Sequence, residues 1–145
     1  MDAAVIDKIN ILQATLRAME LACSNLGTPP PDAVLIDGNQ IPPGIHAAHV
    51  ESLVKGDAKC TAIAAASIIA KVTRDRMMLD ADKQWPGYGF SSHKGYGTKK
   101  HMEAVRRLGP CPIHRLTFRP LPEITAALVG KNYDRHENAE RQKCQ

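Results

Sequence analysis

Val34-Leu-Ile-Asp37-Gly-Asn39 is a short apolar run that ends in a carboxylate and a turn, and it predicts a buried strand. A second, shorter strand is expected within residues 49–54, just before Lys55-Gly-Asp57. The next segment, residues 62–70, is apolar on nearly every face and predicts a helix buried against the sheet. Strand, loop, strand, helix is an α/β order that favours parallel strands, whose carboxyl ends gather functional side chains.

Helices are expected on both sides of this unit. The apolar residues from Val5 to Leu26 recur every three or four positions, which predicts one amphipathic helix that stops at Gly27. A short basic helix is expected from Thr98 to Leu108, with Thr98 as its cap and Gly109-Pro110 as its stop. Residues 122–129 are expected to be helical, whereas residues 131–145 lack a core-forming pattern and predict a disordered tail.

Length and composition favour one soluble domain. The 145 residues are 43% hydrophobic and 23% charged, and they contain no apolar run long enough to cross a bilayer. An acid near the N-terminus argues against a secretory signal, so a cytoplasmic location is expected. The four scattered cysteines form no Cys-x-x-Cys pair and are interpreted as reduced thiols.

The positive charge is concentrated in one region. Residues 93–119 hold seven of the lysines and arginines against the single acid Glu103, although the formal net charge of the whole chain is only +4. The remainder is therefore mildly acidic. This distribution suits a polyanion held on one side of a carboxylate-lined cleft.

Asp37 and Asp57 are the candidate metal ligands and catalytic residues. Each taken singly is better explained as a turn residue, because Asp-Gly and Gly-Asp pairs are common in turns. At the carboxyl ends of neighbouring strands, however, the two carboxylates would lie close enough to share a divalent cation, and their hard oxygens suit Mg²⁺ or Mn²⁺. Asp75 is interpreted as the acid of a structural ion pair on a helix.

The glycine-bearing loop that follows carries aromatic and basic residues. Tyr88 and Phe90 are assigned to the core, and Tyr96, beside Lys94 and Gly95, is assigned to substrate contact. The alternative for Tyr96 is a loop held on the core by its aromatic rings. Candidate phosphate contacts are Lys99, Lys100, Arg106, Arg107 and Arg115. The competing interpretation of these charges is a solvated face.

The histidines show no metal-ligand spacing. His46, His49, His101, His114 and His136 are therefore interpreted as surface or loop residues.

These motifs resemble the ribonuclease HII family over residues 6–120. The matching segments are Leu35-Ile-Asp-Gly-Asn39, Lys55-Gly-Asp57, Ala64-Ala-Ala-Ser-Ile-Ile-Ala-Lys-Val72, Tyr88-Gly-Phe90 and His93-Lys-Gly-Tyr-Gly-Thr98. The resemblance implies a partial ribonuclease H-like α/β fold over residues 1–120, formed by the C-terminal strands of the sheet with flanking helices. Residues 121–145 would be a C-terminal extension with a helical region.

The resemblance also implies an activity and site roles. The family activity is metal-dependent endonucleolytic cleavage of RNA in RNA–DNA hybrids and 5′ of single ribonucleotides in duplex DNA. Neither a membrane nor an obligate protein partner is expected. Asp37 and Asp57 would match the third and fourth acidic ligands. Tyr96 would match the tyrosine that packs on the sugar at the ribonucleotide junction. The predicted substrate-binding residues are Tyr96 and, from the loop and charge pattern, Lys94, Gly95, Lys99, Lys100 and Arg115.

The family's Asp-Glu pair and Gly-Arg-Gly motif precede the matched segments and do not occur in this sequence. The resemblance therefore implies half of an acidic quartet and an unpaired strand edge, so low activity and poor folding are expected of this chain. Two alternatives to a nuclease remain: a noncatalytic nucleic-acid-binding fragment that keeps the basic region, and an inert truncated product.

Overall fold

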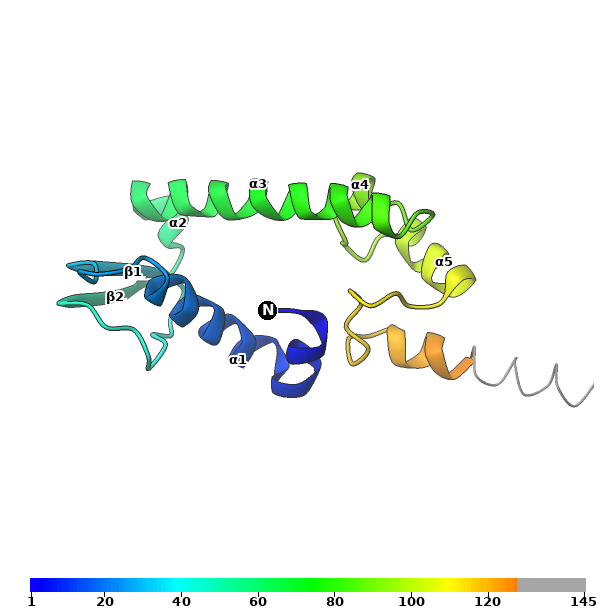
Figure 1. Ribbon diagram of the computed structural model, residues 1–145, viewed down its shortest axis with the longest axis horizontal. Coiled ribbons are helices and arrows are strands. Elements are labelled where there is room, and N and C mark those ends of the chain that lie inside the picture. Colours follow the sequence, from blue (N-terminus) through cyan, green and yellow to red (C-terminus); the bar gives the residue numbers. More distant parts are fainter. Residues whose placement is uncertain (128–145) are drawn as a thin grey trace, which may run out of the picture. The chain divides into compact units, whose positions relative to one another are not determined.

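A computed structural model describes residues 1–127 of the chain (Figure 1). The described residues form two compact units, residues 1–76 and residues 77–127, and the boundary falls within one long helix. Each unit is described by itself. Within the described part, no helix is both long and apolar enough to cross a membrane.

The first unit contains two parallel strands, as the sequence predicted. Strand β1 (Ala33–Asp37) pairs with β2 (His49–Leu53) so that Ala33 lies opposite His49 and Asp37 lies opposite Leu53. The pairing continues one step further, because the N–H of Gly38 donates to the carbonyl of Leu53 at 3.0 Å. The expectation that β1 is buried is only partly correct, since Ile36 is buried and Leu35 is exposed.

Helix α1 (Ala3–Ser24) differs from the single continuous helix that was predicted. Asn10 has φ 67° and ψ 166°, which interrupts the helix, and its side-chain Oδ1 accepts the N–H of Gln13 at 3.1 Å. Asparagine tolerates positive φ and caps the backbone that follows it, which explains a break that the apolar spacing could not reveal. Glu20 on this helix accepts the N–H of Gly44 at 2.9 Å.

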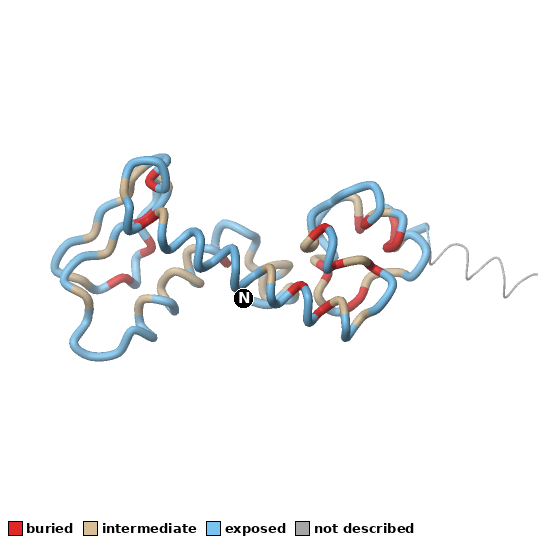
Figure 2. The backbone as a smooth tube through the Cα atoms, turned by 90° about the horizontal axis from the view of Figure 1, so that it is seen from above, coloured by how far each residue is buried: buried red, intermediate tan, exposed pale blue. Residues whose placement is uncertain are grey.

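After β2, the short helix α2 (Gly56–Lys59) leads into the long helix α3 (Thr61–Gln84). Among the described elements, α2 packs on both strands and α3 does not. The prediction that residues 62–70 are buried against the sheet is therefore wrong. Ile63 is buried, whereas Ile68 and Ile69 are 63% and 68% exposed, because no described element covers that apolar face. Figure 2 shows the same scarcity of buried residues in the first unit.

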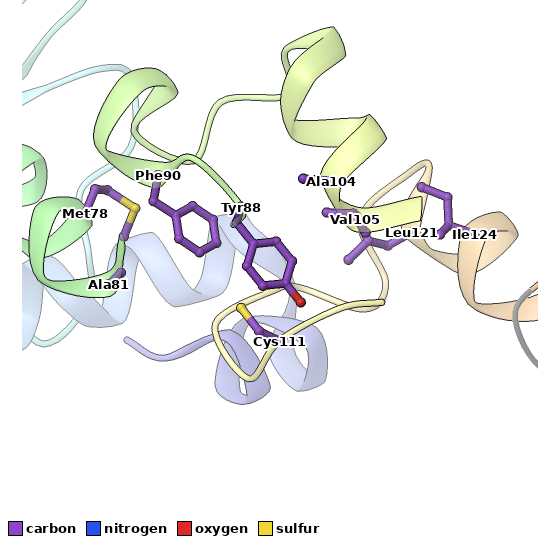
Figure 3. Close-up of a cluster of buried hydrophobic side chains, with 9 residues drawn as sticks. All are labelled: Met78, Ala81, Tyr88, Phe90, Ala104, Val105, Cys111, Leu121 and Ile124. Carbon is purple, nitrogen blue, oxygen red and sulfur yellow. The ribbon is translucent and has the colours of Figure 1, made fainter. Parts of the chain in front are cut away.

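The second unit has a true hydrophobic core. It contains α4 (Phe90–His93), α5 (Lys99–Leu108) and a helical stretch over residues 121–127. Figure 3 shows the core residues, which are Met78, Ala81, Tyr88, Phe90, Ala104, Val105, Cys111, Leu121 and Ile124. The rings of Tyr88 and Phe90 stack with centroids 5.3 Å apart, which confirms their assignment to the core.

The sequence located the boundaries of α5 correctly, whereas α4 lies in a segment that was expected to be a loop. Thr98 is the N-cap of α5, where its hydroxyl accepts the N–H of His101 at 3.3 Å, and Gly109 with φ 79° ends the helix. The helix expected over residues 122–129 is present over residues 121–127, where the described part of the chain ends. The tail expected over residues 131–145 lies outside the described residues.

Candidate functional site

The acidic part of the site is built by the turn that follows β2. Lys55 adopts a left-handed conformation with φ 57°, which reverses the chain after the strand and brings Gly56 to the end of β1. There the N–H of Gly56 donates to Oδ1 of Asp37 at 2.8 Å. A Cβ on residue 56 would lie 3.4 Å from that oxygen and 2.6 Å from Cδ1 of Ile63. Glycine therefore permits the close approach of this turn to Asp37.

Asp57 lies next to this contact, in the first turn of α2. Its Oδ1 accepts the N–H of Ala58 at 2.9 Å, and the residue is exposed. The fold thus brings Asp37 and the Gly56–Asp57 turn together, as the strand order predicted. The roles of both carboxylates in catalysis and in metal binding stay predictions.

The donor chemistry of this pair fits a hard divalent cation, but the number of donors is small. Carboxylate oxygens are the ligands that Mg²⁺ and Mn²⁺ prefer. Within residues 1–127, no three His, Cys, Asp or Glu side chains lie close enough together to hold a metal ion. The described residues therefore supply no third such side chain beside Asp37 and Asp57, and the sharing of a cation by these two stays a prediction. Asp75 instead forms the expected structural ion pair, with Lys71 on the same helix.

The second unit carries the remaining candidates, beginning with the loop of residues 94–97, which we call the Tyr96 loop. Lys94 has φ 51° and ends α4, and its Nζ donates to the carbonyl of Ser91 at 2.6 Å. The N–H of Gly95 donates to Nδ1 of His93 at 3.2 Å. Tyr96 itself is 70% exposed. Its ring is therefore not held by the core, unlike the rings of Tyr88 and Phe90.

Lys99 and Lys100 form the first turn of α5, and both are exposed. The N-terminus of a helix carries a partial positive charge, so two lysines there are electrostatically unfavourable unless an anion is present. Arg107, near the other end of the helix, donates to the carbonyl of Gly87 at 3.2 Å. Lys100 and Arg107 both line a cavity of about 480 Å³. Its other lining residues are Gly87, Tyr88, Gly89, Glu103 and Ala104.

Arg115 occupies the loop after α5. Its guanidinium lies 4.2 Å from the ring centroid of Phe118, which is a cation–π contact. This contact orients the side chain but leaves its N–H groups able to donate to a phosphate. The assignment of Arg115 to substrate binding stays a prediction.

The buried histidines of this unit did not follow from the sequence. His101 and His114 were interpreted as surface or loop residues, but both are buried, and so is His93. The imidazoles of His93 and His101 stack with centroids 4.3 Å apart, and Nε2 of His101 lies 3.1 Å from Nε2 of His114. Burial lowers the pKa of both His101 and His114. The sequence did contain a signal for the burial of His101. Ala104 and Val105 follow it by three and four residues, so the three residues share one face of α5.

The other described histidines and the cysteines lie as expected. His46 and His49 are exposed, and His136 lies outside the described residues. Cys23, Cys60 and Cys111 are free thiols, and Cys144 lies outside the described residues.

The parallel strand pair, the acid at the end of β1 and the order of the helices place the chain in the class of partial ribonuclease H-like α/β folds. The family model for ribonuclease HII matches residues 1–120. The chain belongs to the ribonuclease HII family.

Individual relatives agree with this assignment. Ribonuclease HII of Geobacter metallireducens is 56% identical over 126 residues, which cover 86% of this chain and 57% of that protein. Ribonuclease HII of Endomicrobium trichonymphae is 58% identical over 120 residues, covering 83% of this chain and 56% of that protein. The protein of the same name from Nitrosococcus oceani is 52% identical over 126 residues, covering 87% and 61%. The chain thus spans little more than half the length of these curated relatives.

Proposed function

We propose that this chain supplies the substrate-binding segment and two acidic ligands of a ribonuclease HII endonuclease, which cleaves RNA in RNA–DNA hybrids and 5′ of single ribonucleotides in duplex DNA. The observation that carries the proposal is the contact between Asp37 and Gly56, which brings the end of β1 and the Asp57 turn together in a chain of this family. This turn orients the Asp37 carboxylate through the N–H of Gly56, and it carries Asp57 as its next residue.

Mg²⁺ or Mn²⁺ held by Asp37 and Asp57 would activate a water and stabilise the leaving oxygen in phosphodiester hydrolysis. The chain's own residues have simpler tasks. The Gly56 N–H fixes one oxygen of Asp37, so that the carboxylate needs little reorganisation to bind a cation. The exposed Tyr96 ring offers a flat apolar face on which a sugar can pack.

The basic helix supports a nucleic-acid substrate. Lys99 and Lys100 repel the positive end of the α5 dipole, and a phosphate bound between them would remove that repulsion. Arg115, held over Phe118, can add a further contact to the backbone. These contacts position a duplex and carry no sequence preference.

A noncatalytic nucleic-acid-binding function is the second candidate. The observation that favours it is the lack of any three potential ligand side chains gathered together among residues 1–127. The basic residues of the second unit do not depend on the acids of the first, so duplex binding can persist without cleavage.

The test compares this chain with its Asp37→Asn variant on a labelled DNA duplex that contains one ribonucleotide, in Mg²⁺ and in Mn²⁺. Cleavage on the 5′ side of the ribonucleotide that is lost in the variant supports the nuclease. Salt-dependent binding of the same duplex without cleavage supports the binding protein. A folded sample that neither binds nor cleaves the duplex excludes both functions for this chain.

A further inference from the structure

Tyr96 combines an exposed side chain with a fully restrained backbone. Its N–H donates to the carbonyl of His93 at 2.9 Å. Its carbonyl accepts two bonds, from the N–H of Thr98 at 2.8 Å and from Nδ1 of His101 at 2.9 Å. Since the ring is 70% exposed, these backbone contacts rather than side-chain packing determine where it lies.

The bond from His101 belongs to a chain of buried hydrogen bonds whose direction can be assigned. The backbone N–H of Cys111 can only donate, and it points at Nδ1 of His114 at 3.0 Å. The carbonyl of Cys111 also lies 3.2 Å from this Nδ1, so Cys111 alone does not fix the tautomer of His114. The carbonyl of Tyr96 can only accept, so Nδ1 of His101 carries the proton, and Nε2 of a neutral His101 accepts from the Nε2–H of His114 at 3.1 Å. Nδ1 of His114 then accepts the N–H of Cys111.

His93 is fixed by the same reasoning. The N–H of Gly95 donates to its Nδ1 at 3.2 Å, so the proton lies on Nε2 and is donated to the carbonyl of Tyr88 at 2.8 Å. One imidazole thus ties the Tyr96 loop to the buried Tyr88. Each ring nitrogen of the three histidines thus has a hydrogen-bond partner.

We propose that His93 and His101 are positioning residues that hold the Tyr96 loop for the sugar of its substrate, that His114 fixes the Nδ1–H tautomer of His101, and that protonation of the His101–His114 pair disrupts the chain of hydrogen bonds behind the loop. The part of this inference that concerns the sugar rests on the proposed function. The histidine chain and its effect on the loop stand on the contacts alone.

Protonation would break the chain for a geometric reason. An imidazolium at His101 would turn its Nε2–H toward the Nε2–H of His114, so that two donors would face each other at 3.1 Å. An imidazolium at His114 could donate Nδ1–H to the carbonyl of Cys111 at 3.2 Å, but the N–H of Cys111 would lose its acceptor. Either event leaves a buried donor without an acceptor, which is costly where water cannot replace it, while the bond from Nδ1–H of His101 to the carbonyl of Tyr96 is kept.

The groups that face the histidines favour the neutral state of the pair. Burial lowers the pKa of His101 and His114 and repulsion among the three histidines adds to the effect, whereas the carbonyls of Tyr96 and Cys111 raise the pKa of His101 and His114, respectively. Cys111 lies with Sγ 3.1 Å from Nδ1 of His114, and burial raises the pKa of its thiol, so no thiolate forms there to stabilise an imidazolium. The Tyr88 ring is 5.2 Å from His114, and burial also raises the pKa of its hydroxyl.

One charge opposes this trend at the edge of the cluster. Asp82 has a lowered pKa, chiefly because Ser91 donates hydrogen bonds to it, and it interacts electrostatically with His93. Its carboxylate is thus associated with His93 rather than with the His101–His114 pair.

The experiment is a long-range proton–nitrogen correlation on the ¹⁵N-labelled full chain, titrated from pH 7.5 to pH 5, with the order of the Tyr96 amide measured at each step. At pH 7.5 we expect the Nδ1–H tautomer at His101, which is the minor form of free histidine, and the Nε2–H tautomer at His114 and His93. The Tyr96 amide should be rigid at pH 7.5. An Nε2–H or charged His101 at pH 7.5, or a mobile Tyr96 amide at that pH, overturns the inference.

Variants separate positioning from simple stability. Asn at residue 101 can place an amide N–H where the Nδ1–H of histidine lies, whereas Leu cannot. His101→Asn should therefore keep the Tyr96 amide rigid, and His101→Leu should not. For a duplex with one ribonucleotide, His101→Leu should weaken binding by about threefold to tenfold, the equivalent of one lost hydrogen bond, and His101→Asn should restore it.

The proposed function and the positioning role of the histidines can be disproved separately. Failure of the wild-type chain to bind the duplex counts against the proposed function and leaves the tautomer result to decide the inference. Wild-type binding that His101→Leu leaves unchanged, despite a mobile Tyr96 amide, removes the role in holding the sugar. If His101→Leu does not fold, the tautomers of the three histidines and the order of the Tyr96 amide in the wild-type chain at pH 7.5 still decide the inference.

Discussion

The N–H of Gly56 lies 2.8 Å from Oδ1 of Asp37, although 19 residues separate the two in the sequence. This bond joins the end of β1 to the turn that carries Asp57, so it links the geometry of the candidate metal site to the stability of the first unit. Variants at its two ends should therefore have different and separable effects.

Gly56→Ala is expected to lower the free energy of unfolding by about 1–3 kcal/mol, since the added methyl would lie 2.6 Å from Cδ1 of the buried Ile63. Denaturant unfolding measures the change. Gly97→Ala is the matched control, because its Cβ would meet no atom within 4 Å. Equal unfolding free energies for the two variants would show that the turn is not closely packed.

Asp37→Asn and Asp37→Ala should differ in stability but not in cation binding. The Asn side chain keeps an oxygen that accepts the Gly56 N–H, whereas Ala leaves that buried donor without a partner, at a cost of about 1 kcal/mol. Both variants remove the charge, so both should weaken Mn²⁺ binding measured by electron paramagnetic resonance. Undiminished Mn²⁺ binding in both variants would remove Asp37 from the metal site.

Stability should fall as the pH is lowered from 7.5 to 5.5. The pKa values of His101 and His114 are lowered from the ordinary 6.5 in the folded chain, mainly by burial. Above pH 6.5 both the folded and the unfolded forms are neutral and the full stability is present. As the pH falls below 6.5, the unfolded chain takes up protons before the folded chain does, so the free energy of unfolding decreases.

Denaturant unfolding at several pH values measures this slope. The exposed His49 provides the control, and His49→Gln should keep the slope. The double variant with His101→Asn and His114→Gln should flatten it. The same slope in the double variant as in the wild type would assign the pH dependence to other groups.

Replacing both Lys99 and Lys100 by Ala should weaken duplex binding and reduce its dependence on salt. Removing one lysine–phosphate interaction lowers the slope of log K against log salt by about 0.9, so the double variant should lose about 2. Fluorescence anisotropy at a series of salt concentrations gives both values. Lys83→Ala is the matched control, since that exposed lysine pairs with Asp80, and an unchanged slope in the double variant would place the two lysines outside the interface.

The exposed face of α3 should bind an apolar dye. Ile68 and Ile69 are both more than half exposed, and Val72 extends the same apolar surface. Ile68→Gln with Ile69→Gln should reduce the fluorescence of bound anilinonaphthalene sulfonate, whereas Lys59→Gln, also in the first unit, should not. Equal fluorescence in all three proteins would show that this face is covered in solution.

The sequence by itself determined the local elements and the acidic turn. Apolar runs bounded by turn residues located both strands, and Thr98 and Gly109 marked the ends of α5, because strand pattern and helix caps are properties of neighbouring residues. The pairing of β1 with β2 followed from the α/β order and placed Asp37 near Asp57. The family resemblance also rested on these local motifs, and the match to ribonuclease HII confirms it.

Only the tertiary structure determined which side chains are buried. The apolar composition of residues 62–70 predicted burial, but Ile68 and Ile69 are exposed, because burial depends on a partner surface and not on hydropathy. The histidines show the opposite case. His101 and His114 are polar and were assigned to the surface, yet both are buried. They lie 13 residues apart in the sequence and form a hydrogen bond with each other. A buried polar side chain is stable only when it has such a partner.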